Sequence, residues 1–469
     1  MDDRAKISRD QELTIQRSMR NKNPFRIFRE LLELVKSGNE PIDSRWRPIW
    51  EAVRSDVVES VGAPEHMIDE IDEAIQRIEL IDERIWQLDL QEEDTVCLLL
   101  GAGASAPEPS AIPTVMQLLP ELWRRAGKIG REDIDRLANW CNEHSIKNIE
   151  DLLTAAYLAN FAAKNPNVSD LLDYFLFRAG AEERGRSRER AGVTRVNTAS
   201  VALLQDTLQV LFSLLTSTMI PASPNLGHEA ITNFVKEHKH SSIVTTNYDG
   251  CMDEQLIHAG IEPNTNVDES KVVPANGIDL VKIHGSINWS YCESCHEVRD
   301  FDIIRLKKAY QEDTATYAVI GICKNCGGQR RPLLIPPLGF KFIIFPNLIK
   351  LWNSAREKIE SANYIVVVGF SFSEADTYIN KIIERSMTRH DDQRMIVCDP
   401  NAHLVQSLRN RFSARIDDFE ESRILAANGS ADKVVPKVLQ RLTQTADVEN
   451  VAPLPAPKRE RTKARTEKR

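Results

Sequence analysis

The sequence has no apolar run long enough to cross a membrane. The best candidate, Val201–Ile220, is interrupted by polar residues and predicts a buried helix instead. The N-terminal residues, MDDRAKISRDQE, are charged and lack the apolar stretch of a secretory signal peptide. We therefore expect a cytoplasmic protein without membrane contact.

An excess of positive charge is also absent. The chain carries 60 Lys and Arg against 69 Asp and Glu, a net charge of −9, which does not indicate a nucleic-acid-binding protein. Positive charge gathers in the tail, where Lys458–Arg469 follows a proline-rich run. We expect residues 446–469 to be disordered. Nucleic acid or an acidic partner could bind there, but a solvated tail is the simpler interpretation.

Cysteine is sparse outside two short pairs. Four of the eight cysteines are scattered, which is typical of reduced, buried thiols. The other four form the pairs Cys292-Glu-Ser-Cys295 and Cys323-Lys-Asn-Cys326. Two CxxC pairs in a cytoplasmic protein indicate a zinc site with four thiolate ligands. Because the protein supplies all four ligands, no position is left for a water, and we expect the metal to be structural.

Strand-like and helical segments alternate along most of the chain. Short apolar runs typical of buried parallel strands occur at Thr95–Leu100, Ser242–Thr245, Leu280–Ile283, Tyr364–Val368 and Arg394–Cys398. Helical stretches between them predict an α/β domain with a Rossmann-like parallel sheet covered on both faces. We assign this domain to residues 93–445, with a zinc ribbon at about 290–330.

Helical regions precede and interrupt this domain. Residues 1–92 are predicted to be helical because Phe25–Val35 and Ile68–Leu88 carry apolar residues at helical spacing. The simplest role for this region is oligomerisation or partner binding. Residues from about 130 to 222 predict a helical module inserted into the sheet domain, with Ile149–Ala163 among its best segments.

Glycine-rich and polar segments follow several of the predicted strands. Gly101-Ala-Gly103-Ala-Ser105 comes directly after the first strand, where glycine lets the backbone approach a pyrophosphate. Tight turns between a strand and a helix also use glycine without any ligand, so this motif alone is a weak signal. A second segment, Gly369-Phe-Ser371-Phe-Ser373, follows another strand, and Asp399 ends the next one. Such an acidic residue can accept ribose hydroxyls, although Asp before Pro is also a common turn former.

Two further strand ends carry residues suited to chemistry. Thr245-Thr246-Asn247-Tyr248-Asp249 follows one strand, and it could equally be an Asx turn or a helix cap. His284 follows the strand at 280–283 and has glycine beside it. An imidazole suits proton transfer at neutral pH. Because the carboxyl ends of parallel strands meet at one edge of a sheet, we expect these residues to share a crevice.

As a set, these motifs resemble the sirtuin (Sir2) superfamily in type, order and spacing, over roughly residues 95–440. The matching segments are GAGAS (101–105) with AIP (111–113), PNLGH (224–228), TTNYD (245–249), HGS (284–286) and the second cysteine pair. The resemblance implies NAD as substrate and a structural zinc ion.

The resemblance also implies individual roles. Asn247 would hold the nicotinamide ribose and a water, Asp249 would bind the nicotinamide amide, and His284 would act as a base toward a ribose hydroxyl. The remaining matching residues would contact the dinucleotide: Gly101, Ala102, Gly103, Ser105, Pro113, Thr246, Gly369, Ser371, Ser373 and Asp399.

Two departures from the family pattern bear on the reaction. Deacylases of the family continue the GIP motif with Asp-Phe-Arg, where this sequence has Thr114-Val115-Met116. Their strip that pairs with an acyl-lysine peptide is replaced here by Leu333–Gly339, whose two prolines lack backbone donors. These departures resemble the SIR2-like domains of bacterial antiphage systems, which hydrolyse NAD. The zinc knuckles fit deacylases better.

We therefore expect an NAD+ glycohydrolase that releases nicotinamide and ADP-ribose. It would be a regulated effector of antiphage defence that acts by depleting NAD. Since constant activity would be lethal, we expect a homo-oligomer or a regulatory partner protein to control it. An NAD-dependent protein deacylase and a non-catalytic sensor of NAD or ADP-ribose are the alternatives.

Overall fold

The structure is a computed structural model. It describes residues 53–54, 71, 80–127, 132–143, 146, 148–164, 215–267, 276–292, 294–312, 321–335, 349–373, 376–416 and 419–443. The predicted basic tail and nearly all of the predicted N-terminal helical region lie outside these ranges, as does the middle of the predicted inserted module.

The main sheet has eight strands in the order β1-β12-β11-β10-β2-β3-β5-β4. Neighbouring strands are parallel, except that β1 pairs antiparallel with β12. This arrangement confirms the expected Rossmann-like α/β fold. The strands are β1 (Leu80–Ile81), β2 (Val96–Leu100), β3 (Ser241–Thr245), β4 (Pro263–Asn264), β5 (Ile278–Lys282), β10 (Tyr364–Val368), β11 (Arg394–Asp399) and β12 (Ile424–Asn428).

The five strands expected from apolar runs all form, but the helix expected over Ile68–Leu88 is wrong in its second half. Leu80–Ile81 is strand β1, and Glu83–Gln87 is a 3-10 helix, η1. Pairing of β1 with the edge of β12 overrides the helical spacing of this segment. Ile85 is nevertheless buried in the core, so its apolar side chain packs as expected.

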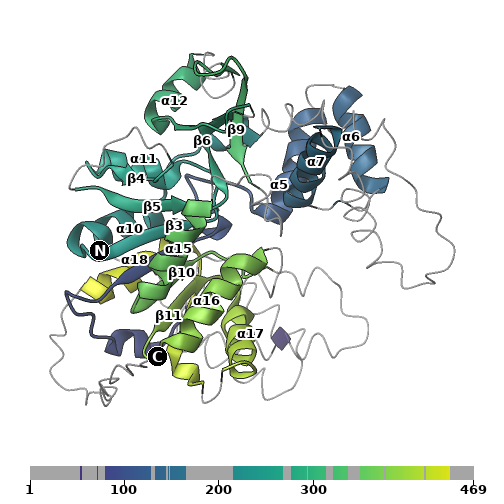
Figure 1. Cartoon of the computed structure of the whole chain (residues 1–469). Coiled ribbons are helices and arrows are strands. Elements are labelled where there is room, and N and C mark those ends of the chain that lie inside the picture. The colour runs from purple at the N-terminus through teal and green to yellow at the C-terminus, as the bar shows by residue number, and fades with distance from the viewer. Residues whose placement is uncertain are drawn as a thin grey trace, which may run out of the picture.

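Alternate residues of the strands face two separate cores. In β2, Cys97 and Leu99 belong to one buried cluster, while Val96, Leu98 and Leu100 belong to the other. Helices cover both faces (Figure 1). The first core includes α15 (Ile349–Ser361), α16 (Thr377–Arg389) and α17 (Ala402–Ser413), and the second includes α10 (Leu226–Glu237), α11 (Cys251–His258) and α18 (Ala431–Thr443).

The strand order reverses between β2 and β10. From β2 the chain moves to β3 on one side, and it later returns to β10 on the other side of β2. The connections after these two strands therefore leave the sheet in opposite directions. Doubly wound folds bind ligands in the crevice at such a switch point, outside the carboxyl ends of the strands.

A smaller antiparallel sheet lies beside the carboxyl ends of β3 and β5 (Figure 1). It has the order β7-β6-β9-β8 and lies next to helix α12 (Ile303–Gln311). Its strands are β6 (Gly285–Cys292), β7 (Val298–Asp300), β8 (Gly321–Ile322) and β9 (Gln329–Leu334). This sheet carries the two cysteine pairs.

Three helices form a separate layer beside the main sheet (Figure 1). They are α5 (Val115–Gly127), α6 (Glu132–Glu143) and α7 (Ile149–Lys164), and α5 packs against the other two. The helix expected at Ile149–Ala163 is confirmed as α7.

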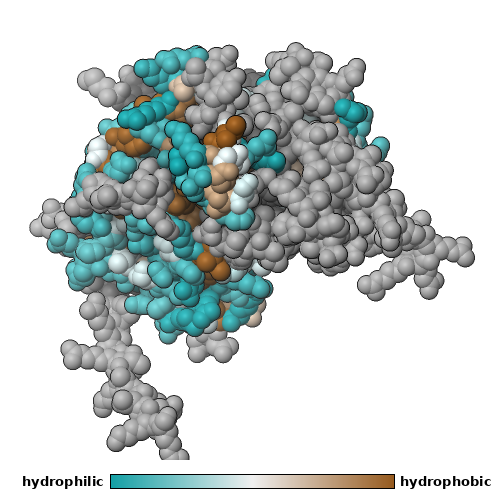
Figure 2. Space-filling view, turned by 45° about the horizontal axis from the view of Figure 1, so that its top comes forward, coloured by the Kyte–Doolittle hydropathy of each residue, from teal (hydrophilic) through white to brown (hydrophobic). Residues whose placement is uncertain are grey.

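The described surface is mostly hydrophilic in the view of Figure 2. Among the described residues, no helix combines the length and the apolar character that a membrane span requires.

Candidate functional site

The glycines after β2 and β10 touch each other at the switch point. The N–H of Gly101 donates to the carbonyl of Val368, and the N–H of Gly103 donates to the carbonyl of Gly369, each at 2.9 Å. Gly369 has φ +60°, and a Cβ added there would lie 2.4 Å from Cα of Gly103. Only glycine fits this contact, which keeps side chains out of the crevice floor.

The glycine loop does not lead directly into an α-helix. Ala102–Ala104 is a 3-10 helix of three residues, η2, and α5 starts only at Val115. The loop between them folds back on itself, since the N–H of Ile112 donates to the carbonyl of Ser105 at 3.0 Å. This contact places half-buried Pro113 next to the glycine loop. An anion in the crevice would therefore not face the end of a long helix dipole.

Ser105 lies at the centre of a buried hydrogen-bond network. The N–H of Asn225 donates to Nδ1 of His228 at 3.2 Å, so the neutral ring carries its proton on Nε2. That Nε2 lies 3.3 Å from Oγ of Ser105 and donates to it. Burial lowers the pKa of His228 to about 4, although nearby Asp249 favours the charged form. The histidine is therefore a neutral brace for the glycine loop.

The same serine fixes the amide of Asn247. Nδ2 of Asn247 donates to Oγ of Ser105 at 3.3 Å. The N–H of Asn247 donates to Oγ1 of Thr245 at 3.0 Å, and the N–H of Thr246 donates to the carbonyl of Leu100. With Nδ2 turned toward the serine, Oδ1 of Asn247 points the other way. The structure thus brings the β2 and β3 loops together and orients one amide oxygen, which can accept a hydroxyl or a water proton.

Asp249 is nearly buried, and its carboxylate has a structural task. Oδ1 accepts from the N–H of Cys251 at 3.0 Å, which is the Asx turn that the sequence allows as a simpler interpretation. Its backbone carbonyl accepts from Nζ of Lys282 at 2.6 Å, and the same ammonium forms an ion pair with Asp253 at 2.8 Å. Lys282 is 1% exposed. This buried pair anchors the loop that carries Asn247 and Asp249.

His284 lies directly after β5 and beside the end of β3. It is 1% exposed, and its ring centre lies 6.1 Å from the rings of Tyr248 and Trp352. Nε2 of His284 lies 3.3 Å from Oδ1 of Asp376, which precedes α16. The sequence motif predicts His284, but the spacing gives no indication that Trp352 and Asp376 converge on it.

The remaining predicted residues lie along the carboxyl ends of β10 and β11. The N–H of Gly369 donates to the carbonyl of Cys398, next to Asp399. Burial raises the pKa of Asp399 to about 6, opposed by a hydrogen bond from the N–H of Asn401. Ser371 and Ser373 are exposed. The predicted residues that follow neighbouring strands thus lie in one row across the switch point, in the order His284, Asn247, Gly103, Gly369 and Asp399.

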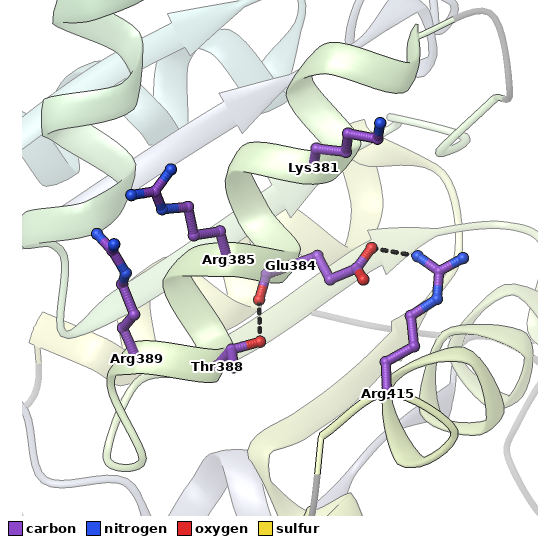
Figure 3. Close-up of a pocket in the computed structure, with 6 residues that line it drawn as sticks. All are labelled: Lys381, Glu384, Arg385, Thr388, Arg389 and Arg415. Carbon is purple, nitrogen blue, oxygen red and sulfur yellow. Dashed lines mark hydrogen bonds and ion pairs between the residues drawn. The ribbon is translucent and has the colours of Figure 1, made fainter.

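Two cavities lie away from this row. One of about 320 Å³ lies on the outer face of α16 and is lined by Lys381, Glu384, Arg385, Thr388, Arg389 and Arg415 (Figure 3). Glu384 pairs with Arg415 across it, and Arg385 and Arg389 point away from that pair (Figure 3). The other, of about 510 Å³, lies between β7 and α12. Neither includes a residue predicted to bind NAD.

The four paired cysteines converge on one point. Their sulfur atoms all lie within 4.8 Å of one another, with Cys292 and Cys326 3.4 Å apart and Cys295 and Cys323 3.7 Å apart. Tetrahedral zinc with Zn–S bonds of about 2.3 Å requires sulfur separations of about 3.8 Å. The residues therefore fit a structural zinc site. Arg330 donates to Cys323 Sγ at 3.2 Å, as an outer-shell donor would to a zinc-bound thiolate.

Residues 190–375 match the family model described as the Sir2 family. An NAD-dependent protein deacetylase of Staphylococcus aureus is 26% identical over 201 residues, covering 40% of this chain and 67% of that protein. One of Clostridium tetani is 26% identical over 153 residues, covering 32% of this chain and 47% of that protein. Residues 190–375 are therefore similar to the Sir2 family.

Two solved Sir2 structures are similar to this chain. A complex of a Sir2 homologue with NAD is 16% identical and has a TM-score of 0.41, covering 77% of this chain and 94% of that chain. A second Sir2 enzyme structure is 16% identical with a TM-score of 0.38, covering 80% of this chain and 98% of that chain.

Proposed function

We propose that this protein is an NAD+ glycohydrolase. The observation that carries the proposal is the row of side chains at the switch point, where Asn247 is tied through Ser105 to the glycine loop and His284 lies beside the same strand ends. A dinucleotide laid across the glycines would have its nicotinamide ribose near Asn247 and its adenosine ribose near Asp399.

The reaction joins a water oxygen to C1′ of the ribose and breaks the bond from C1′ to the nicotinamide nitrogen. Nicotinamide leaves as a neutral molecule, and the water releases a proton. Oδ1 of Asn247 would orient the ribose and the water, Asp249 would hold the nicotinamide amide, and His284 would accept a proton from a ribose hydroxyl. Since positive charge grows on the ribose as nicotinamide departs, these oxygen atoms and the deprotonated hydroxyl stabilise the transition state.

The segment after β9 supports hydrolysis over deacylation. The N–H of Ile335 donates to the carbonyl of His284 at 2.8 Å, and its carbonyl accepts from the hydroxyl of Tyr248 at 2.9 Å. Both backbone groups of Ile335 are therefore bonded within the chain, and its N–H is not available to donate to a substrate peptide. Pro336 and Pro337 follow at once in the sequence and lack backbone donors.

A protein deacylase is the second candidate. The four-cysteine cluster and the names of the relatives favour it. A third, a non-catalytic sensor of NAD or ADP-ribose, would retain its biological effect in an Asn247→Ala variant.

Control of the activity belongs to the same proposal. An unregulated hydrolase would exhaust the NAD of its own cell, so we propose that a homo-oligomer or a partner protein restrains it, with residues 1–92 as contact. A role as an effector of antiphage defence, acting by NAD depletion, would fit such control.

The proposal is tested by measuring NAD in cells that overexpress the protein. We expect NAD to fall with the parent chain and to stay at its normal level with His284→Ala or Asn247→Ala at equal expression. Equal NAD in all three strains would contradict the proposed activity.

A further inference from the structure

Asp376 precedes helix α16 but does not cap it. Aspartate in this position usually accepts from the first N–H groups of its helix. Here the side chain makes no such bond, and Oδ1 has no hydrogen-bond partner among the described residues. By contrast, Asp302 accepts from the N–H groups of Ile304 and Arg305 at the start of α12.

The carboxylate of Asp376 is turned toward the proposed catalytic histidine instead. Its Oδ1 lies 3.3 Å from Nε2 of His284, and the two side chains are 10% and 2% exposed. A buried carboxylate is costly unless it has a partner of opposite charge or a hydrogen-bond donor. A protonated imidazole supplies both.

We propose that Asp376 is a positioning residue that acts on the reaction through His284. The inference rests on the proposed function of His284 as a base. When His284 takes the proton of a ribose hydroxyl, its ring becomes positively charged. The carboxylate stabilises that imidazolium and holds the ring in one orientation, while the proton stays on the histidine. The aromatic rings of Tyr248 and Trp352 confine the imidazole on other sides.

Kinetics of Asp376→Asn test the idea, because asparagine keeps the size of the side chain and can cap α16. We expect kcat for NAD hydrolysis to fall about 10- to 1,000-fold with KM changed less than about threefold, since general base catalysis is weakened while binding is not. Asp302→Asn, a cap variant at α12, should keep the parent kcat. An unchanged or raised kcat in Asp376→Asn would overturn the inference.

A double variant separates positioning from a merely structural role. Because Asp376 acts through His284, adding Asp376→Asn to His284→Ala should cause no further loss of activity. Losses that multiply would show that Asp376 contributes independently and would overturn the inference.

A spectroscopic measurement needs no turnover. In protein labelled with ¹⁵N-histidine, the ring signals of His284 are those missing from His284→Ala. We expect them to shift in Asp376→Asn and to stay in place in Asp302→Asn. Unshifted His284 signals in Asp376→Asn would overturn the inference even if the parent protein hydrolyses NAD. Absence of turnover with a shifted signal would contradict the proposed function alone.

Discussion

A Cβ on Gly369 would lie only 2.4 Å from Cα of Gly103. The loops after β2 and β10 therefore meet without side chains between them. These strands are the two that flank the switch point of the sheet. The contact joins the glycine loop after β2 to a segment more than 260 residues further along the chain.

Replacement of Gly369 tests the importance of this contact. Gly369→Ala would place a methyl group against the backbone of Gly103 and Ala104 in addition to straining φ. We expect a loss of about 3 kcal/mol or more in the free energy of unfolding and loss of NAD binding by calorimetry. Gly260 also has positive φ, but a Cβ there meets nothing within 4 Å. Gly260→Ala should therefore cost about 1 kcal/mol and leave NAD binding intact.

His228 makes stability depend on pH. Its pKa is lowered to about 4 by burial, below the ordinary value near 6.5. Between these values the unfolded chain takes up a proton that the folded chain does not, so this contribution is present above pH 6.5 and is lost as pH falls toward 4. We expect His228→Gln to remove up to about 3 kcal/mol of the decline in unfolding free energy over that interval. The exposed His240, replaced by Gln, serves as control. Equal slopes in parent and His228→Gln would contradict the assignment.

Asp399 makes stability depend on pH in the opposite direction to His228. Burial raises its pKa to about 6, so the folded protein holds a proton there more tightly than the unfolded chain does. Ionisation of Asp399 thus destabilises the fold above pH 6, and stability is regained as pH falls toward 4. Asp399→Asn should raise the unfolding free energy at pH 7.5 by up to about 3 kcal/mol, with no gain at pH 4. The same variant should bind NAD more weakly if the carboxylate accepts ribose hydroxyls. A stability gain that persists at pH 4 would refute the raised pKa as its cause.

The cysteine cluster predicts one zinc ion per chain. Metal analysis of the purified protein should find that ratio, and Cys323→Ser should lower it. Cys141→Ala, which changes a buried thiol outside the cluster, should keep the zinc. Because the metal closes the small sheet that follows His284, chelation should lower the melting temperature of the parent protein. Zinc content that is the same in both variants would rule out the site.

The sequence alone is enough to predict five strands of the main sheet and the glycine motifs, because both depend on local patterns. Buried parallel strands such as β10 read as continuous apolar runs, and GAGAS follows β2 directly. β12 was not predicted, since its residues include two alanines with weak strand preference and its pairing with β11 and β1 decides the conformation. Pairing at that edge also replaced part of the expected helix at Ile68–Leu88.

From the sequence, only those site residues that stand in motifs at strand ends can be predicted. Asn247 and His284 stand in recognisable motifs, whereas Asp376 meets His284 from nearly 100 residues away. The brace formed by His228 on Ser105 spans 123 residues. Such pairings depend on how helices dock onto the sheet, which local patterns do not encode.

Product analysis with NAD as the sole substrate tests the central claim most directly. The purified protein is incubated with NAD with and without an acetyl-lysine peptide, and the products are separated by chromatography. The account predicts nicotinamide and ADP-ribose in equal amounts without the peptide, and release slowed at least about 100-fold with His284→Ala. NAD that stays intact alone but is consumed with the peptide, with transfer of the acetyl group to ADP-ribose, would contradict it.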